Sequence, residues 1–128
     1  MAFEENVTGN SIGSLTAAAD LSGSQFCLVK VTGVAAVNLA TTATDFACGV
    51  IQNKPTSGQS TQITPAGSGA VTKIKVGAAV AAGDRLTADG TGRGITTVTA
   101  GNRYSAIALE TATTANQLIA ALLVNGTV

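Results

Sequence analysis

Histidine and tryptophan are both absent from this chain of 128 residues. Histidine is the most frequent general base and a common metal ligand, so its absence removes the Ser-His and Cys-His pairs of nucleophilic catalysis. Without histidine, Cys27 and Cys48 do not make a typical zinc site. We therefore expect no catalytic residue, no metal site, no bound cofactor and no small-molecule substrate, and we expect that the protein is not an enzyme.

Aromatic residues are also scarce. They make up 3% of the chain, while 45% is hydrophobic, and much of that hydrophobic part is alanine. Burial energy scales with apolar area, of which alanine offers little, so Phe26, Phe46 and Tyr104, together with scattered Val, Leu and Ile residues, are predicted to carry most of the core packing. A core this thin predicts that contacts with other chains supply part of the stability.

Charged residues account for only 11% of the chain, with seven basic and seven acidic residues. A nucleic-acid binder needs a basic patch, and Lys73 and Lys75, on one face of a predicted strand, are the nearest thing to one. No apolar run, including residues 118–124, is long enough to span a membrane, and the start "MAFEENVTGNSIGS" has no features of a signal peptide. We therefore expect no nucleic-acid partner and no membrane partner.

The two cysteines lie in apolar contexts, "QFCLV" and "FACGV". Without a secretory signal, two buried free thiols are favoured for Cys27 and Cys48. A disulfide between neighbouring strands is the alternative. The sequence leaves this choice open.

From Ser24 onward, β-prone runs alternate with turn residues, which predicts about eight short strands. The runs cover residues 25–33, 35–41, 45–55, 61–67, 70–77, 84–89, 94–100, 103–112 and 116–126. This spacing is typical of an all-β fold, a small β-sandwich or barrel, in one domain over residues 24–128. The last run is rich in leucine and alanine, but Gly126 closes it early and "ALLV" suits a buried central strand, so a strand is favoured over a helix.

Residues 1–23 are polar and interrupted by glycine, and they sustain neither a helical nor a strand period. They predict an extended N-terminal arm, with a short helical turn over the alanine-rich residues 14–20. Four spaced apolar residues in this arm are the candidate contacts to a neighbouring protein: Phe3, Val7, Ile12 and Leu15. The alternative is that the segment folds back onto its own domain.

The stretch "GDRLTADGTGRG" combines two aspartates with a run of glycines. Asp84 and Asp89 lack the alternating acids of a calcium loop, so they are interpreted as turn-forming residues. "GTGRG" is followed by the β-prone run "ITTVT" instead of the helix that a phosphate loop requires, which favours a hairpin turn. Lys54 lacks the acidic or methionine neighbours of a lipoyl-type carrier lysine and is interpreted as a solvated loop residue.

Three segments in order, "GVIQNKPTSGQ", "VTKIKVGAAVAAGDRLTADGTGRGITTVTAGN" and "SAIALETATTANQLIAALLVNG", carry a family resemblance. Together they resemble the small capsid cement (decoration) proteins of tailed bacteriophages, over about residues 46–128. Residues 83–86, "GDRL", and 106–110, "AIALE", carry most of the likeness.

The resemblance implies a β-tulip-like sandwich or barrel that binds the outer surface of an icosahedral capsid. It implies a homotrimer that clamps neighbouring subunits of the major capsid protein, with terminal arms that reach adjacent subunits. Phe3, Val7, Ile12 and Leu15 would then be buried at the shell. The protein would be made in the bacterial host cytoplasm and end on the virion, at the outer capsid surface.

Two alternatives remain at this stage. A module of a trimeric phage fibre or spike would also be β-rich, although fibres usually show repeats or a heptad stalk, and this chain has neither. A small carbohydrate-binding β-domain is the other, although such sites favour exposed aromatic side chains, and this chain has one tyrosine and no tryptophan.

Overall fold

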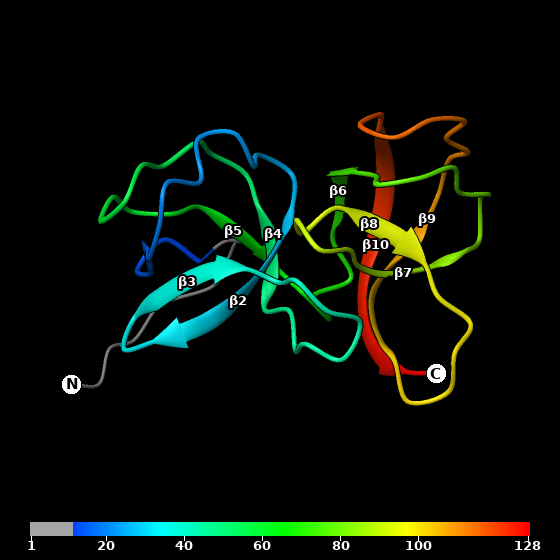
Figure 1. Ribbon diagram of the computed structural model, residues 1–128, viewed down its shortest axis with the longest axis horizontal. Helices are drawn as coiled ribbons and strands as arrows, with labels where there is room; N and C mark the ends of the chain where they lie inside the picture. Colours follow the sequence, from blue (N-terminus) through cyan, green and yellow to red (C-terminus); the bar gives the residue numbers. More distant parts are fainter. Residues whose placement is uncertain (1–11) are drawn as a thin grey trace.

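The computed structural model describes residues 12–128, which form ten β-strands in two five-stranded sheets and contain no helix (Figure 1). The two sheets lie side by side, the first built from the N-terminal half of the chain and the second from the C-terminal half. None of these residues therefore belongs to a helix that would cross a membrane. The all-β class predicted from the sequence is confirmed.

In the first sheet, four strands pair antiparallel, and the short edge strand pairs parallel to its neighbour. In spatial order the strands are β1 (Thr16–Ala17), β3 (Ala36–Leu39), β2 (Leu28–Gly33), β4 (Gly49–Ile51) and β5 (Ile63–Pro65). Strands β2 and β3 form a hairpin whose turn contains Ala35, with a φ of 51°. Each predicted run of this half contains one of the strands β2 to β5.

All pairs in the second sheet are antiparallel. In spatial order its strands are β6 (Val71–Lys75), β10 (Leu118–Thr127), β9 (Arg103–Ala108), β7 (Arg85–Ala88) and β8 (Gly94–Thr96). Ile119, Ala121 and Leu123 of β10 are buried while the residues between them are less so. This period of two is the strand pattern, and the prediction of a strand over residues 116–126 is confirmed.

The buried core is aliphatic: the predicted Val, Leu and Ile residues form most of it, while of the predicted aromatic rings Phe26 packs against its edge and Phe46 is 54% exposed. One cluster of buried side chains spans both sheets and includes Leu28, Val50, Ile74, Leu86 and Leu123. A second cluster lies within the first sheet. Ala88, Ala106, Ala108 and Ala121 of the second sheet are buried in the cluster that spans both sheets.

The three aromatic side chains of the described region lie at the rim of this core. Phe46 is 54% exposed, and its ring lies 4.8 Å from the guanidinium carbon of Arg103. Tyr104 is half-buried, with the guanidinium of Arg85 5.2 Å from its ring. Cation–π pairs of this kind at partly exposed sites contribute about 0.5–1 kcal/mol each.

Residues 12–21, which the sequence interpretation placed in an extended arm, pack on the first sheet. Ile12 donates its N–H to the carbonyl of Ile63 at 2.7 Å, and Leu15 and Leu21 are buried. The helical turn predicted over residues 14–20 is wrong, because Thr16–Ala17 pairs with β3 as strand β1. A strand there puts Leu15 and Ala17 on the same inward face, which a helical turn would separate.

Asp45 organises the loop between β3 and β4. Its Oδ2 accepts hydrogen bonds from the N–H of Thr41 at 2.9 Å, the Lys30 ammonium at 2.9 Å and the N–H of Thr42 at 3.1 Å. The Thr41 N–H and then Lys30 hold the pKa of this carboxyl at about 2, below its ordinary value of 3.8. The same loop reaches the second sheet, where the Ala43 carbonyl accepts from the Arg103 N–H at 2.7 Å.

Asp45→Asn is expected to lower the free energy of unfolding by about 1–2 kcal/mol at neutral pH, because hydrogen bonds to a charged group are lost. Since the folded pKa is depressed, the carboxylate stabilises the folded chain fully above pH 4, and this contribution is lost as the pH falls toward 2. Urea titrations at several pH values measure it. A difference from the parent protein that stays constant between pH 7 and pH 2.5 would contradict this account.

Candidate functional site

Phe26 joins the two sheets through its backbone. Its N–H donates to the carbonyl of Ile51 in β4 at 2.8 Å, and its carbonyl accepts from the N–H of Lys75 in β6 at 2.9 Å. Phe26 does this with a φ of 65°, in the left-handed region that side chains other than glycine rarely adopt. The unusual conformation turns the two backbone groups toward different sheets.

Gly92 makes a further backbone link between the sheets. It lies in the turn between β7 and β8, and its carbonyl accepts from the N–H of Leu28 in β2 at 2.7 Å. Its φ is 80°, and a Cβ at this position would lie 2.9 Å from the Leu28 carbonyl oxygen. The glycines of "GTGRG" therefore form the predicted hairpin turn and also allow that turn to contact the first sheet.

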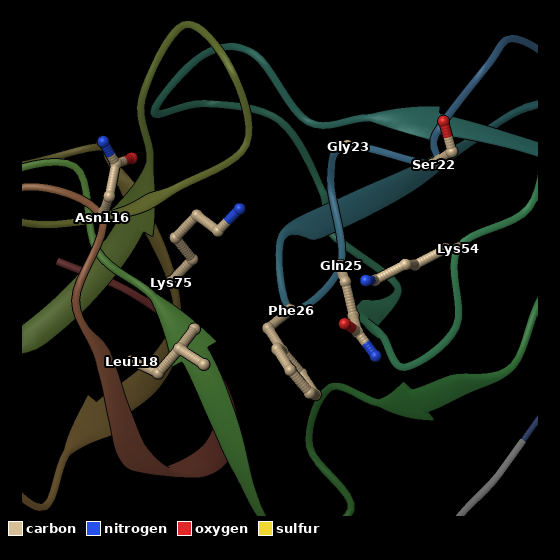
Figure 2. Close-up of a pocket in the computed structure, with 8 residues that line it drawn as sticks. All are labelled: Ser22, Gly23, Gln25, Phe26, Lys54, Lys75, Asn116 and Leu118. Carbon is tan, nitrogen blue, oxygen red and sulfur yellow. The ribbon is translucent and has the colours of Figure 1, made fainter.

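A groove runs along this junction. One hollow of about 310 Å³ is lined by Ser22, Gly23, Gln25, Phe26, Lys54, Lys75, Asn116 and Leu118 (Figure 2). A second hollow of about 300 Å³ shares Gly23, Lys75 and Asn116 with the first and adds Ser24, Cys27, Thr91 and Arg93. Because the hollows share three residues, we treat them as one surface feature and call it the inter-sheet groove.

The described lining of the inter-sheet groove is basic. It includes Lys54, Lys75 and Arg93, and no acidic residue lines either hollow. Figure 2 shows the Lys54 and Lys75 side chains on opposite sides of the segment 22–26, both directed toward it. The Arg93 guanidinium is neutralised by Asp89 at 2.9 Å and donates to Asn116 Oδ1 at 3.0 Å. The net positive charge of the groove therefore comes from the two lysines.

The groove is equipped to bind and has no evident catalytic pair. Its one thiol belongs to Cys27, and burial raises the pKa of that thiol, which disfavours the reactive thiolate. Cys27 and Cys48 are both free, as favoured from the sequence, and burial raises the pKa of Cys48 to about 11. Within residues 12–128 no three His, Cys, Asp or Glu side chains gather as a metal site would require.

The two aspartates of the glycine-rich stretch form turns, as predicted. Asp89 Oδ1 accepts from the N–H groups of Thr91 at 2.8 Å and Arg93 at 2.9 Å. Asp84 Oδ2 accepts from the Ala81 N–H at 2.9 Å and the Thr96 hydroxyl at 2.8 Å. Both carboxylates thus hold local backbone in place.

The four residues predicted as external contacts lie apart from the inter-sheet groove or outside the described part of the chain. Phe3 and Val7 lie outside the described residues. Ile12 is half-buried against β5, and Leu15 is 7% exposed within the hydrophobic cluster of the first sheet. Sequence reasoning considered Lys75 together with Lys73, and Lys54 by itself, and it missed the groove, because the backbone of Phe26 brings Lys75 in β6 to the first sheet only in the folded chain.

The chain is a small all-β protein of two joined sheets. A solved structure of another protein is similar to it. No protein-family model and no curated protein matches this sequence. The fold does resemble the crystal structure of the head fibre gp8.5 N base in bacteriophage phi29, with a TM-score of 0.68 and 19% sequence identity. The similarity covers 88% of this chain and 92% of that one, so the whole two-sheet arrangement is shared.

Proposed function

We propose that this chain is a structural protein of a bacteriophage virion and that it binds the outer surface of the capsid as a cement protein. The observation that carries the proposal is the fold shared with the N base of a phage head fibre along nearly the full length of both chains. The sequence resemblance to capsid cement proteins supports the same placement. The role is one of binding and stabilisation, with no catalytic step.

In this proposal each copy contacts neighbouring subunits of the major capsid protein, and three copies associate as a homotrimer. The surface offers apolar contacts for such binding, notably Val34 in the β2–β3 turn, 91% exposed, and Val98 between β8 and β9, 84% exposed. Covering one such side chain contributes on the order of 1–3 kcal/mol. Copies held on a lattice add these modest contacts through effective concentration.

The proposal is tested with capsids that lack this protein. Added protein is expected to co-sediment with the capsids and to raise the temperature at which they release DNA. Removal of residues 1–11, which include Phe3 and Val7, is expected to weaken binding about tenfold or more if both side chains are covered at the shell. Leu15→Ala is the contrasting variant. Leu15 is buried in the first sheet, so its truncation should lower the stability of the free protein. Full-length protein that does not sediment with capsids would refute the capsid assignment.

A second candidate, the base of a head fibre, is favoured because the similar structure is itself the N base of a phage head fibre. Both candidates place the chain on a phage head, and electron micrographs of the native particle separate them. A cement protein is seen as a compact density pressed against the shell at many lattice positions. A fibre base is seen as the foot of a rod that projects from the shell.

A further inference from the structure

Lys54 and Lys75 are the basic residues of the inter-sheet groove that have no counterion among residues 12–128. Neither Lys54 nor Lys75 makes an ion pair with a carboxylate of residues 12–128. All five side-chain carboxylates of this region already accept hydrogen bonds from their own surroundings, namely those of Asp20, Asp45, Asp84, Asp89 and Glu110. Two ammonium groups directed into one groove without an acid favour an anionic ligand.

The amide side chains of the groove are already oriented by the protein. Gln25 donates its Nε2 to the carbonyl of Gln52 at 2.8 Å, which leaves its Oε1 as an acceptor. Asn116 uses its Oδ1 to accept from Arg93 at 3.0 Å, which leaves its amide N–H groups as donors. The groove thus offers one oriented acceptor and one oriented donor beside its positive charges.

The groove also has an apolar wall. Phe26 is half-buried, Leu118 is 46% exposed, and both line the same hollow. Of the three residues other than glycine that have a positive φ within residues 12–128, two line this groove, Phe26 at 65° and Asn116 at 69°. This conformation costs a phenylalanine roughly 1–2 kcal/mol, while an asparagine adopts it more readily, and strained residues cluster at ligand sites.

We propose that the inter-sheet groove binds a sugar residue that carries a carboxylate, within an acidic polysaccharide. Lys54 and Lys75 hold the carboxylate, Gln25 Oε1 and the Asn116 amide bind ring hydroxyls, and Phe26 and Leu118 contact the apolar face of the ring. A neutral sugar leaves the lysines unpaired, and a bare phosphate leaves the apolar wall uncovered. This assignment goes beyond capsid binding and does not depend on it.

The dimensions of the groove fit a short stretch of such a chain. The first hollow, about 310 Å³, lies at the lower end of the range of about 300–1,000 Å³ for ligand pockets, and the second hollow extends it. Because the groove is shallow and two lysines supply its charge, single-site binding is weak and depends on salt. On a particle, many copies would add their contacts.

Calorimetry or amide chemical-shift titration of the full chain with tetragalacturonate tests the proposal, with maltotetraose and inorganic phosphate as comparison ligands. Tetragalacturonate is expected to bind at low salt, and Lys75→Gln is expected to weaken it about tenfold. Arg85→Gln is the matched control, because it removes the same charge from an exposed side chain outside the groove lining and should leave the affinity unchanged.

Lys54→Gln is the second variant. Lys54 is exposed in a loop, so its replacement should not disturb folding, and thermal melts check that the variant is folded. Several results would overturn the assignment: no binding of tetragalacturonate, equal binding of maltotetraose, or displacement by an equal concentration of phosphate. An unchanged affinity in both folded lysine variants, or a loss in Arg85→Gln as large as in Lys75→Gln, would overturn it as well. If the protein does not bind tetragalacturonate, the expected sedimentation with capsids is unaffected, so the two proposals are tested separately.

Discussion

Gly49→Ala is expected to lower the free energy of unfolding by about 3 kcal/mol or more, a large part of the stability of a domain of this size. A Cβ at Gly49 would lie 2.6 Å from Ile63 Cγ2 and would meet the backbone carbonyl of Thr64 still more closely. Strand β4 is paired on both sides, with Gly49 opposite Val29 in β2 and Pro65 in β5. The backbone therefore cannot move aside without breaking one of these ladders.

Gly33→Ala is the matched control for this variant. Gly33 is also a strand glycine, at the end of β2. The atom nearest to a Cβ added there is the Cβ of Ala36, at 3.9 Å, which is an ordinary contact distance. Its replacement is expected to change stability by less than about 1 kcal/mol, in either direction. Urea denaturation of both variants gives the comparison. Equal effects at the two positions would show that the close approach of β4 and β5 does not limit the fold.

Leu28→Ala is expected to lower the free energy of unfolding by about 2–5 kcal/mol. Leu28 is fully buried in the cluster that spans both sheets, and its N–H bonds to Gly92 across the junction. A cavity here removes contacts from the first and the second sheet together. Because the side chain lies at the junction, the surrounding strands cannot collapse around the cavity without shifting one sheet against the other.

Leu109→Ala is the control for the leucine at the junction. Leu109 follows β9 and is 46% exposed, so its truncation is expected to cost no more than about 0.5–1 kcal/mol. Denaturation midpoints and the accessibility of the Cys27 thiol to a modifying reagent measure both variants. Leu28→Ala should expose Cys27 at lower denaturant, because Cys27 directly precedes Leu28 at the junction of the sheets. Similar midpoints for the two leucine variants would contradict the central role of the junction.

The strands were predictable because their signals are local. The apolar run that Gly126 closes and the glycine-rich turn between residues 88 and 94 depend only on neighbouring residues, and the structure has a strand and a hairpin there. The turn roles of Asp84 and Asp89 were predictable for the same reason, since an aspartate that bonds backbone two to four residues away needs no distant partner.

The positions of Phe46 and Leu15 show where local reasoning stops. Phe46 is the kind of residue expected in a core, yet it is 54% exposed, with its ring against Arg103. Leu15 lies in a segment without a clear period, yet it is buried because β3 accepts a short parallel strand at its edge. Both outcomes depend on which surfaces meet in the folded chain, and no short segment of the sequence indicates that.

The amino-acid sequence alone determined the all-β class, the order of strands and the absence of histidine chemistry, since each follows from composition or from spacing along the chain. Tertiary structure decided that Phe26 would join the two sheets and that Lys54 and Lys75 would face one groove. These residues are distant in sequence, and backbone hydrogen bonds from Phe26 to Ile51 and Lys75 bring them together. The positive φ of Phe26 is held by these two bonds, one to each sheet.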